Sequence, residues 1–314
     1  MALTKLTDRN LKVRYRLSYE AALKDQPWDE FVRRVDTNQP GGEEFGGNEP
    51  ISGMRRSRGD QSYDRLIGVA FPIAMTPYEN GFVVPMDDWN FEKVGAVSDS
   101  LKQLSGNAAS HMGELVEDLI EEADDVYDPI ETTIKYFSTA HVLDDASTQS
   151  NYLKGDVVTV LNVSSKTAPT VAEWQAALPT LGVTMMQLTD RQGHFVNRGA
   201  TSFTIAVPAV LFPNLEQAIN QRNINGGGDN PVEKSMFSFI PMLLPGCTET
   251  YKAFMFVNGR SPIVMQVLRD PGKLIVKGPG SDYWDTHDAA LCRCRGKYGA
   301  GWDNYQHAAM LEFT

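Results

Sequence analysis

The sequence contains few cysteines and no long run of apolar residues. Its three cysteines, Cys247, Cys292 and Cys294, are too few and odd in number for a disulfide framework, which fits a reducing compartment. The longest apolar stretch, 236–244, contains a serine and a proline and is far shorter than a membrane span. The N-terminal stretch 1–16 alternates charged and apolar residues and does not resemble a signal peptide. We therefore expect a soluble protein that is made in the cytoplasm.

Basic residues are outnumbered. The chain has 29 lysines and arginines against 40 aspartates and glutamates, a net charge of −11. An autonomous DNA or RNA binder needs a basic footprint, as does a protein that binds an anionic membrane, so the charge argues against both classes. Hydrophobic residues at 42% and charged residues at 22% are ordinary for a folded protein, and 314 residues suggest about two domains.

Catalytic signatures are missing as well. There is no His-Glu-x-x-His, no Gly-x-Ser-x-Gly and no strong cysteine–histidine context. The glycine-rich stretch 225–229 is not followed by Gly-Lys-Ser/Thr, so we interpret it as a flexible loop. The stretch 296–301 does not open an apolar helix, so it does not fit a dinucleotide fingerprint. These absences disfavour an enzyme.

Two groups of acidic residues and histidine are candidates for a metal site. Asp282, Asp285, His287 and Asp288 lie within seven residues, and such side chains can hold a metal. Their spacing matches no defined motif, so we interpret them as a solvated polar loop. A metal-dependent hydrolase using His287 and these aspartates is kept as an alternative function.

The same polar-loop interpretation applies to His141 with Asp144 and Asp145. Cys292 and Cys294 are two residues apart and point to one face of a strand, so we expect small buried apolar residues there rather than metal ligands.

The N-terminal part predicts two limbs. Residues 1–37 are expected to form a helical arm, with Ser18 capping a short helix and Pro27 starting a second one. The second helix would carry a narrow apolar stripe, which cannot bury itself: Trp28, Phe31, Val32 and Val35. Residues 38–86 are expected to form a long two-stranded excursion, with a loop over 39–50, strands over 66–75 and 81–84, and a turn at 77–81. Because an isolated hairpin is marginal in water, we expect another chain to support it.

Residues 87–125 give the clearest helical signal. Asp87 or Asp88 can cap the start. Apolar residues then recur at helical spacing: Phe91, Val94, Val97, Leu101, Leu104, Ala108, Met112, Leu115 and Leu119. At ~1.5 Å per residue this is a rod of roughly 50 Å. Gly95, Gly106 and Gly113 within it suggest bending or close packing.

The rest of the chain mixes strands with short helices, so the fold class is α+β. Thr170 and Glu173 form a capping box before a helix that Pro179 follows. A further helix is expected over 214–221. Strands are expected over 203–207, 253–257, 263–268, 274–277 and 291–295.

Charge is strongly segregated. The stretch 103–133 has no lysine or arginine, and its acidic residues include Glu117, Asp118, Glu121, Glu122, Asp124 and Asp125. Carboxylates at a helix C-terminus oppose the helix dipole. The arginines that would complement them are Arg55, Arg56, Arg58 and Arg65. Two readings stay open, namely two solvated faces or a contact in which one chain's basic excursion lies over its neighbour's acidic helix end.

Three local motifs carry a family resemblance. They are Tyr136-Phe-Ser-Thr-Ala-His141, the segment 203–211 followed by 215–218, and Arg293-Cys-Arg-Gly-Lys-Tyr-Gly-Ala-Gly-Trp302 with Gln306 and Ala308-Ala309. With the order of the predicted elements, the sequence resembles a tailed-phage major capsid protein of the Hong Kong 97 fold, closest to Mu-like major head subunits.

The resemblance implies a domain layout. Residues 1–37 would be the N-terminal arm, 38–86 the E-loop, 87–149 the P-domain with its spine helix, 150–250 the axial A-domain, and 251–314 the returning P-domain strands. The glycine-rich loop 223–231 would be a candidate for the contact at the capsomer axis.

The resemblance also implies a function without catalysis, cofactor or metal. The chain would self-assemble as hexamers and pentamers into an icosahedral shell around double-stranded DNA, held non-specifically. It would be part of the virion, assembled in the host cytoplasm with a portal. A shell of the same fold enclosing a cargo protein, an encapsulin, is the first alternative. Candidate intersubunit residues are the four arginines, the six acidic residues named above, Trp28 and Phe31.

The chain departs from some relatives in two ways. They join the E-loop to a neighbour by a Lys–Asn isopeptide bond, whereas no lysine lies between Lys24 and Lys93 here, so we expect a non-covalent shell. Others carry a long N-terminal scaffolding segment, whereas this sequence opens with arm-like residues. We therefore expect a separate scaffolding protein and a decoration protein that compensates for the missing cross-links.

Overall fold

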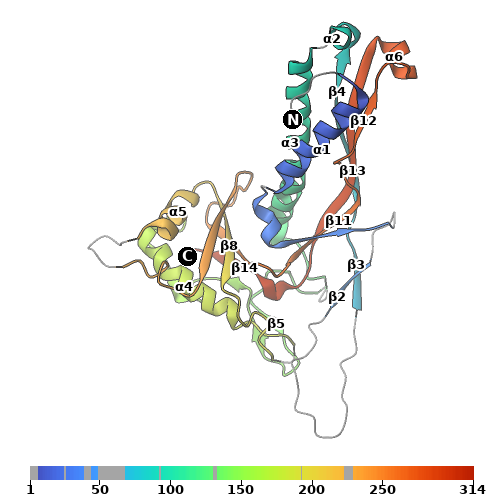
Figure 1. Ribbon diagram of the computed structural model, residues 1–314. Coiled ribbons are helices and arrows are strands. Elements are labelled where there is room, and N and C mark those ends of the chain that lie inside the picture. The colour runs from blue at the N-terminus through green and yellow to red at the C-terminus, as the bar shows by residue number, and fades with distance from the viewer. Residues whose placement is uncertain are drawn as a thin grey trace.

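The protein combines an elongated region with a rounder lobe (Figure 1). Its structure, a computed structural model, describes residues 6–24, 26–38, 44–48, 68–91, 93–129, 133–191, 193–222 and 229–314. Each of the two regions is built on its own five-stranded sheet. The described fold is therefore mixed α and β, as the sequence predicts. None of the described helices is both long and apolar enough to cross a membrane.

The elongated sheet is organised around one long strand. Its strands are β1 (Val32–Asp36), β4 (Thr76–Pro85), β11 (Ile263–Arg269), β12 (Leu274–Lys277) and β13 (Ala289–Trp302). They lie in the order β1-β11-β13-β12, and β4 also pairs with β13. Ten consecutive residue pairs join β4 to β13, from Thr76↔Tyr298 to Pro85↔Ala289. Segments more than 200 residues apart in sequence therefore lie side by side.

Two helices cover one face of this sheet. They are α1 (Asp8–Lys24) and α3 (Val94–Glu121). Leu11, Tyr15 and Tyr19 of α1 and Leu101 of α3 share an apolar core with Cys292 of β13. At 28 residues, α3 is about 42 Å long. Figure 1 shows both helices running along the sheet.

The lobe sheet has the order β7-β14-β10-β8-β9. Its strands are β7 (Tyr152–Leu153), β8 (Ser202–Pro208), β9 (Ser238–Leu244), β10 (Lys252–Val257) and β14 (Ala308–Glu312). Two helices pack on one face, α4 (Val171–Met186) and α5 (Phe212–Asn220). The edge strand β9 contains Pro241, and proline is tolerated in sheets mainly on edges.

The remaining described elements are short. They are η1 (Pro27–Glu30), β2 (Glu44–Asn48), β3 (Gly68–Pro72), α2 (Met86–Asn90), η2 (Glu122–Asp124), β5 (His141–Val142), β6 (Thr148–Gln149), η3 (Thr159–Leu161), α6 (Asp282–His287) and η4 (Tyr305–His307). Two two-stranded ribbons form, β2 with β3 and β5 with β6.

The predicted arm is partly wrong. One helix, α1, replaces the short helix capped by Ser18, because its three buried residues recur every four positions against α3 and β12. The second predicted helix stops after one turn, η1, and the chain continues as β1. Parallel pairing with β11 gives this strand its backbone partners, and Val32 and Val35 are β-branched residues that suit a strand.

The predicted excursion is also corrected. The turn expected at 77–81 does not exist, because β4 pairs with β13 without interruption. Residues 44–48, expected to be loop, form β2 and pair antiparallel with β3. A two-stranded ribbon is therefore present, but between different segments from those predicted.

The long helix begins later than predicted. α2 ends at Asn90, and α3 starts only at Val94. Phe91, expected on the buried face, is 77% exposed. The residue buried here is Trp89, whose ring packs edge-on against Trp284 of α6 at 6.1 Å. The prediction of close packing is confirmed at Gly113, where a Cβ atom would lie 2.8 Å from Nε1 of Trp28.

Predictions for the lobe and the returning strands are mostly confirmed. The capping box of Thr170 and Glu173 forms, although α4 runs past Pro179 to Met186. β8, α5, β10, β11 and β12 lie where strands and a helix were expected. Residues 296–301, set aside above as a dinucleotide-binding loop, belong to β13. At Gly299 a Cβ atom would lie 2.1 Å from the carbonyl oxygen of Ala74, so glycine allows these two segments to approach.

Candidate assembly surfaces

The acidic end of α3 has a paired side and an unpaired side. On the paired side, Asp124 contacts Lys252 of β10, and Asp125 lies 3.3 Å from Lys135. Glu121 accepts hydrogen bonds from the backbone nitrogen and the hydroxyl of Thr248, at 3.2 and 2.9 Å. These contacts fix the helix end to the lobe. Part of the predicted acidic surface is therefore used within the chain.

The unpaired side forms a stripe that runs along α3 and ends at the first residue of η2. Glu114, Asp118 and Glu122 are exposed, four residues apart, and make no ion pair with any side chain that the structure describes. Glu117 beside them is half-buried, and this burial, followed by the charges of Asp118 and Glu114, raises the pKa of its carboxyl. The carboxylates of this stripe therefore repel one another, and a positively charged partner would reduce that repulsion.

The predicted complement of this stripe, Arg55, Arg56, Arg58 and Arg65, lies outside the described residues. What the structure describes is the ribbon on either side of that segment, with Asn48 paired to Gly68 at its end.

Trp28 and Phe31 are placed in the protein's own core. Trp28 is 2% exposed, and Phe31 is fully buried with its ring stacked on Phe256 at 4.4 Å. The expectation that the arm finds burial only on another copy is therefore wrong for these residues. Sequence reasoning could not assign their partners, which come from α3 and from a strand more than 220 residues away.

The metal-site candidates are placed in ordinary structural roles. Asp282, Asp285, His287 and Asp288 are exposed, as predicted, but Asp282–His287 form the short helix α6 and not a loop. Ser281 caps this helix, and His287 stacks on Tyr283. Within the described ranges, no group of three or more histidine, cysteine or acidic residues could hold a metal.

His141 is not solvated as predicted. It is fully buried, its Nε2 lies 3.0 Å from Oδ1 of Asn151, and its ring stacks on Tyr305 at 3.6 Å. The prediction for Cys292 and Cys294 is confirmed, since both are buried in the core under α1 and α3. Burial raises the pKa of the Cys292 thiol to about 12, so it is not a nucleophile at neutral pH.

Sequence reasoning missed Lys252, the residue that pairs with the acidic helix end. Its side chain is 7% exposed. It is the first residue of β10, Lys252-Ala-Phe-Met-Phe-Val257, in which every other residue is apolar. A single charge at the head of such a strand is the signal that could have indicated a buried ion pair.

Comparison with known proteins identifies the fold. Residues 9–161 match the family model of the Mu-like prophage major head subunit gpT. Comparison with curated proteins finds no match. Among solved structures, the chain is similar to the procapsid of bacteriophage JBD30, with 12% identity and a TM-score of 0.52, covering 98% of this chain and 76% of that one.

Two further capsids show the same likeness. The capsid of cyanophage P-SCSP1u shares 14% identity at a TM-score of 0.52, covering 90% of this chain and 86% of that one. The mature capsid of bacteriophage PhiM1 shares 12% identity at a TM-score of 0.52, covering 92% and 87%. At such identities the likeness shows the fold, and the family match adds the role. Neither favours an encapsulin or a hydrolase.

The chain therefore has the Hong Kong 97 fold of tailed-phage major capsid proteins, and its residues 9–161 match the Mu-like major head subunits, a family of structural proteins and not of enzymes.

Proposed function

We propose that this chain assembles non-covalently, as hexamers and pentamers, into an icosahedral shell that encloses double-stranded DNA in the virion. The observation that carries the proposal is the match to a major head subunit within a capsid fold. A net charge of −11 suits a wall along which packaged DNA must move without binding. In this proposal the elongated region is the P-domain and the lobe is the A-domain. Two predicted bounds change: β10 and β14, expected among the P-domain strands of 251–314, belong to the lobe, and the E-loop shortens from 38–86 to 38–75 because β4 belongs to the elongated sheet.

The test is to express the chain with and without neighbouring head genes and image the product by negative-stain microscopy. Closed particles containing nuclease-protected DNA, from which single chains separate on a denaturing gel, are the expected result. A covalent ladder on that gel would contradict the non-covalent shell, and particles filled only with protein would contradict DNA packaging. We also propose a separate scaffolding protein, a decoration protein and a portal as partners, with assembly in the host cytoplasm.

The unpaired stripe on α3 supports a specific contact between copies. In this proposal, the arginines at 55, 56, 58 and 65 of one chain lie over Glu114, Asp118 and Glu122 of its neighbour. Each exposed pair contributes only ~0–1 kcal/mol, but the contact repeats at every subunit of the shell. Trp28, although buried in its own chain, supports the contact indirectly, because its indole lies against Gly113 of α3; Phe31 stacks on Phe256 and has no part in the contact.

Charge reversal tests this contact. Arg55→Glu with Arg56→Glu is expected to abolish particles while circular dichroism and melting of the unassembled chain stay unchanged. Asp118→Lys with Glu122→Lys in the same chain is expected to restore particles. The matched control is Arg9→Glu with Lys12→Glu on the exposed side of α1, which changes the net charge equally and should still assemble. Normal particles from the Arg55→Glu, Arg56→Glu variant would contradict the proposed contact.

A further inference from the structure

The elongated sheet has a strongly basic face on the side away from α1 and α3. On β13, residues that point to the helices alternate with residues that point to this side, which are Leu291, Arg293, Arg295 and Lys297. The strand registers place Lys277 of β12 and Arg269 of β11 next to this row. We call these five cations the basic face: Arg269, Lys277, Arg293, Arg295 and Lys297. Its charge is opposite in sign to the net charge of −11.

The chain neutralises only part of this charge. Arg295 lies 2.9 Å from Glu79 of β4. Arg269, Lys277 and Arg293 make no ion pair with any side chain that the structure describes. In addition, Nε of Arg293 is buried, and no described group accepts a hydrogen bond from it. Because a buried donor without an acceptor is unfavourable, a carboxylate placed against this guanidinium would stabilise it.

Apolar side chains lie beside Arg293 on the same face. Val83 of β4 is 49% exposed and lies opposite Leu291. Ile275 of β12 is 37% exposed and lies opposite Arg293. Double-stranded DNA presents a charged backbone and would leave these apolar groups against phosphates. A protein surface that places acidic residues next to an apolar one matches both features, so the face favours a protein partner.

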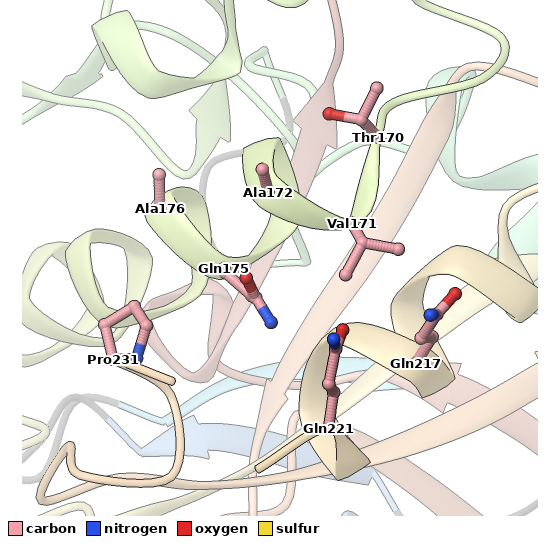
Figure 2. A pocket seen from close by; sticks show the side chains of 8 residues that line it. All are labelled: Thr170, Val171, Ala172, Gln175, Ala176, Gln217, Gln221 and Pro231. Atoms are coloured by element: carbon pink, nitrogen blue, oxygen red, sulfur yellow. The ribbon is translucent and has the colours of Figure 1, made fainter. Parts of the chain in front are cut away.

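The cavity in the lobe offers no comparable charge. Figure 2 shows it between α4 and α5, and none of the residues that line it is charged. Its lining includes three glutamines and four apolar residues: Gln175, Gln217, Gln221, Val171, Ala172, Ala176 and Pro231. Of these two surfaces, the basic face is therefore the one on which charge can select a partner.

The spacing along β13 fits a helix. Arg293, Arg295 and Lys297 are two residues apart on a strand, so each step is ~6.8 Å. Acidic residues four apart on one side of an α-helix are ~6 Å apart. The opposite face of this sheet is already packed by two helices that run along it (Figure 1). A helix on the basic face would complete a sheet with helices on both sides, which is a stable layer arrangement.

We propose that the basic face binds an acidic helix of a second protein. The carboxylates of that helix contact the arginines and the lysine of β13, and an apolar side chain at one end packs against Val83 and Ile275. A second copy of this chain is not the expected partner, because its α3, whose acidic residues are four apart, is assigned above to the arginines at 55–65. The inference goes beyond the proposed shell, since it concerns a surface that the single chain already presents.

A designed peptide tests this binding on the unassembled chain. The probe is a fluorescein-labelled peptide of about 18 residues, in which one stripe carries a leucine and then three glutamates at every fourth position. Fluorescence anisotropy should show saturable binding, and circular dichroism should show a gain of helix, because so short a peptide is marginally helical when free. No saturable binding would overturn the proposal. Equal binding of a peptide of the same composition, with its glutamates spread around the helix, would also overturn it.

Variants of the chain locate the binding. Arg293→Glu with Lys277→Glu should weaken it by at least about tenfold, because two attractions become repulsions. Arg293→Gln keeps the size of the side chain and should give a smaller loss. The matched control is Arg9→Glu with Lys12→Glu, on the exposed side of α1, which changes the net charge equally and should leave binding unchanged. Melting curves check that each variant is folded. Equal losses from both charge reversals would contradict recognition by the basic face.

Two measurements separate the other occupants. A DNA duplex of about 20 base pairs that binds more tightly than the peptide, and loses binding with Arg293→Glu, would make nucleic acid the partner. Self-association of the chain that sedimentation detects and Arg293→Glu abolishes would make a second copy the partner. Either result overturns the acidic helix of a second protein. Because all these measurements use the single chain, a failure to form particles contradicts only the proposed shell.

Discussion

The two five-stranded sheets differ in how many of their faces the chain itself covers. In the lobe, β10 is buried at all six positions. Ala253, Met255 and Val257 point into the core under α4 and α5, while Phe254 and Phe256 point into the core below α3. The centre of this sheet is therefore covered on both sides by the chain itself, whereas its edge strand β9 leaves Ile240 and Leu243 each 40% exposed.

The elongated sheet is covered on both faces at β11, where Ile263–Val267 are all buried, but on one face only around β12 and the first half of β13. Cys292 and Cys294 of β13 point to α1 and α3, whereas Leu291, Arg293 and Arg295 alternate onto the opposite face. On that face Leu291 pairs with Val83 of β4 and Arg293 with Ile275 of β12. Val83 is 49% and Ile275 37% exposed. The lobe core therefore stabilises the single chain, while the elongated sheet leaves apolar side chains exposed.

The largest effect is expected from the lobe core. Trp174 of α4 is fully buried, with its ring edge-on to Phe313 at 4.7 Å. Trp174→Ala should lower the free energy of unfolding by about 3–5 kcal/mol, because it removes a large side chain that its neighbours cannot replace. Urea unfolding of the unassembled chain measures this. Val183→Ala, on an exposed position of the same helix, should change it by less than about 0.5 kcal/mol. Equal losses from both would contradict a lobe stabilised by its own core.

A smaller loss of stability is expected at low pH, and it arises from a residue in the connection between β13 and β14. His307 lies there, with Nδ1 2.7 Å from Oδ1 of Asn197. Because Nδ2 of Asn197 donates to the carbonyls of Met185 and Gln306, its Oδ1 accepts and His307 is the donor. Burial, followed by the charge of Arg260, lowers the pKa of His307 from 6.5 to about 4.

The sign of the pH dependence follows from that pKa. Between pH 6.5 and 4 the unfolded chain binds a proton that the folded chain does not, so stability is full above 6.5 and falls as the pH drops toward 4. The loss reaches roughly 3 kcal/mol. Burial also lowers the pKa of His141, which acts in the same direction, while burial raises the pKa of Asp303, which acts against it. His307→Gln should flatten the slope of unfolding free energy against pH; an unchanged slope would refute the role of His307.

The contrast between the sheets also explains what sequence could predict. Local rules located the capping box of Thr170 and the alternation around Cys292, because each depends on residues a few positions apart. They also predicted β12 at its observed bounds, Leu274–Lys277. The family resemblance, carried by short motifs in 136–141, 203–218 and 293–309, predicted the fold that the comparisons found.

Where the sequence predicted the wrong element, the secondary structure is determined by pairing with segments far away in the sequence. Val32 and Val35 fit an apolar helical stripe equally well, but β11, more than 220 residues later, pairs with them as a strand. Residues 77–81, predicted to form a turn, continue as a strand because each of them pairs with a residue of β13. For the assembly surfaces, sequence located the acidic end of α3 but could not show that Lys252 pairs with Asp124 there. Whether the arginines at 55–65 meet that stripe stays a prediction.

The smallest effect on the stability of the single chain is expected from substitutions on the exposed face of the elongated sheet. Val83→Thr with Ile275→Thr replaces exposed apolar groups by residues that still favour strands, so the free energy of unfolding should change by less than about 0.5 kcal/mol per site. If another copy covers this face in the shell, particle yield should nevertheless fall sharply in negative-stain counts at equal protein concentration. Val142→Thr, a similarly exposed residue outside this sheet, is the control and should assemble normally. Full yield from the double variant would mean that the elongated sheet keeps its bare face toward solvent, and that the difference between the two sheets has no part in assembly.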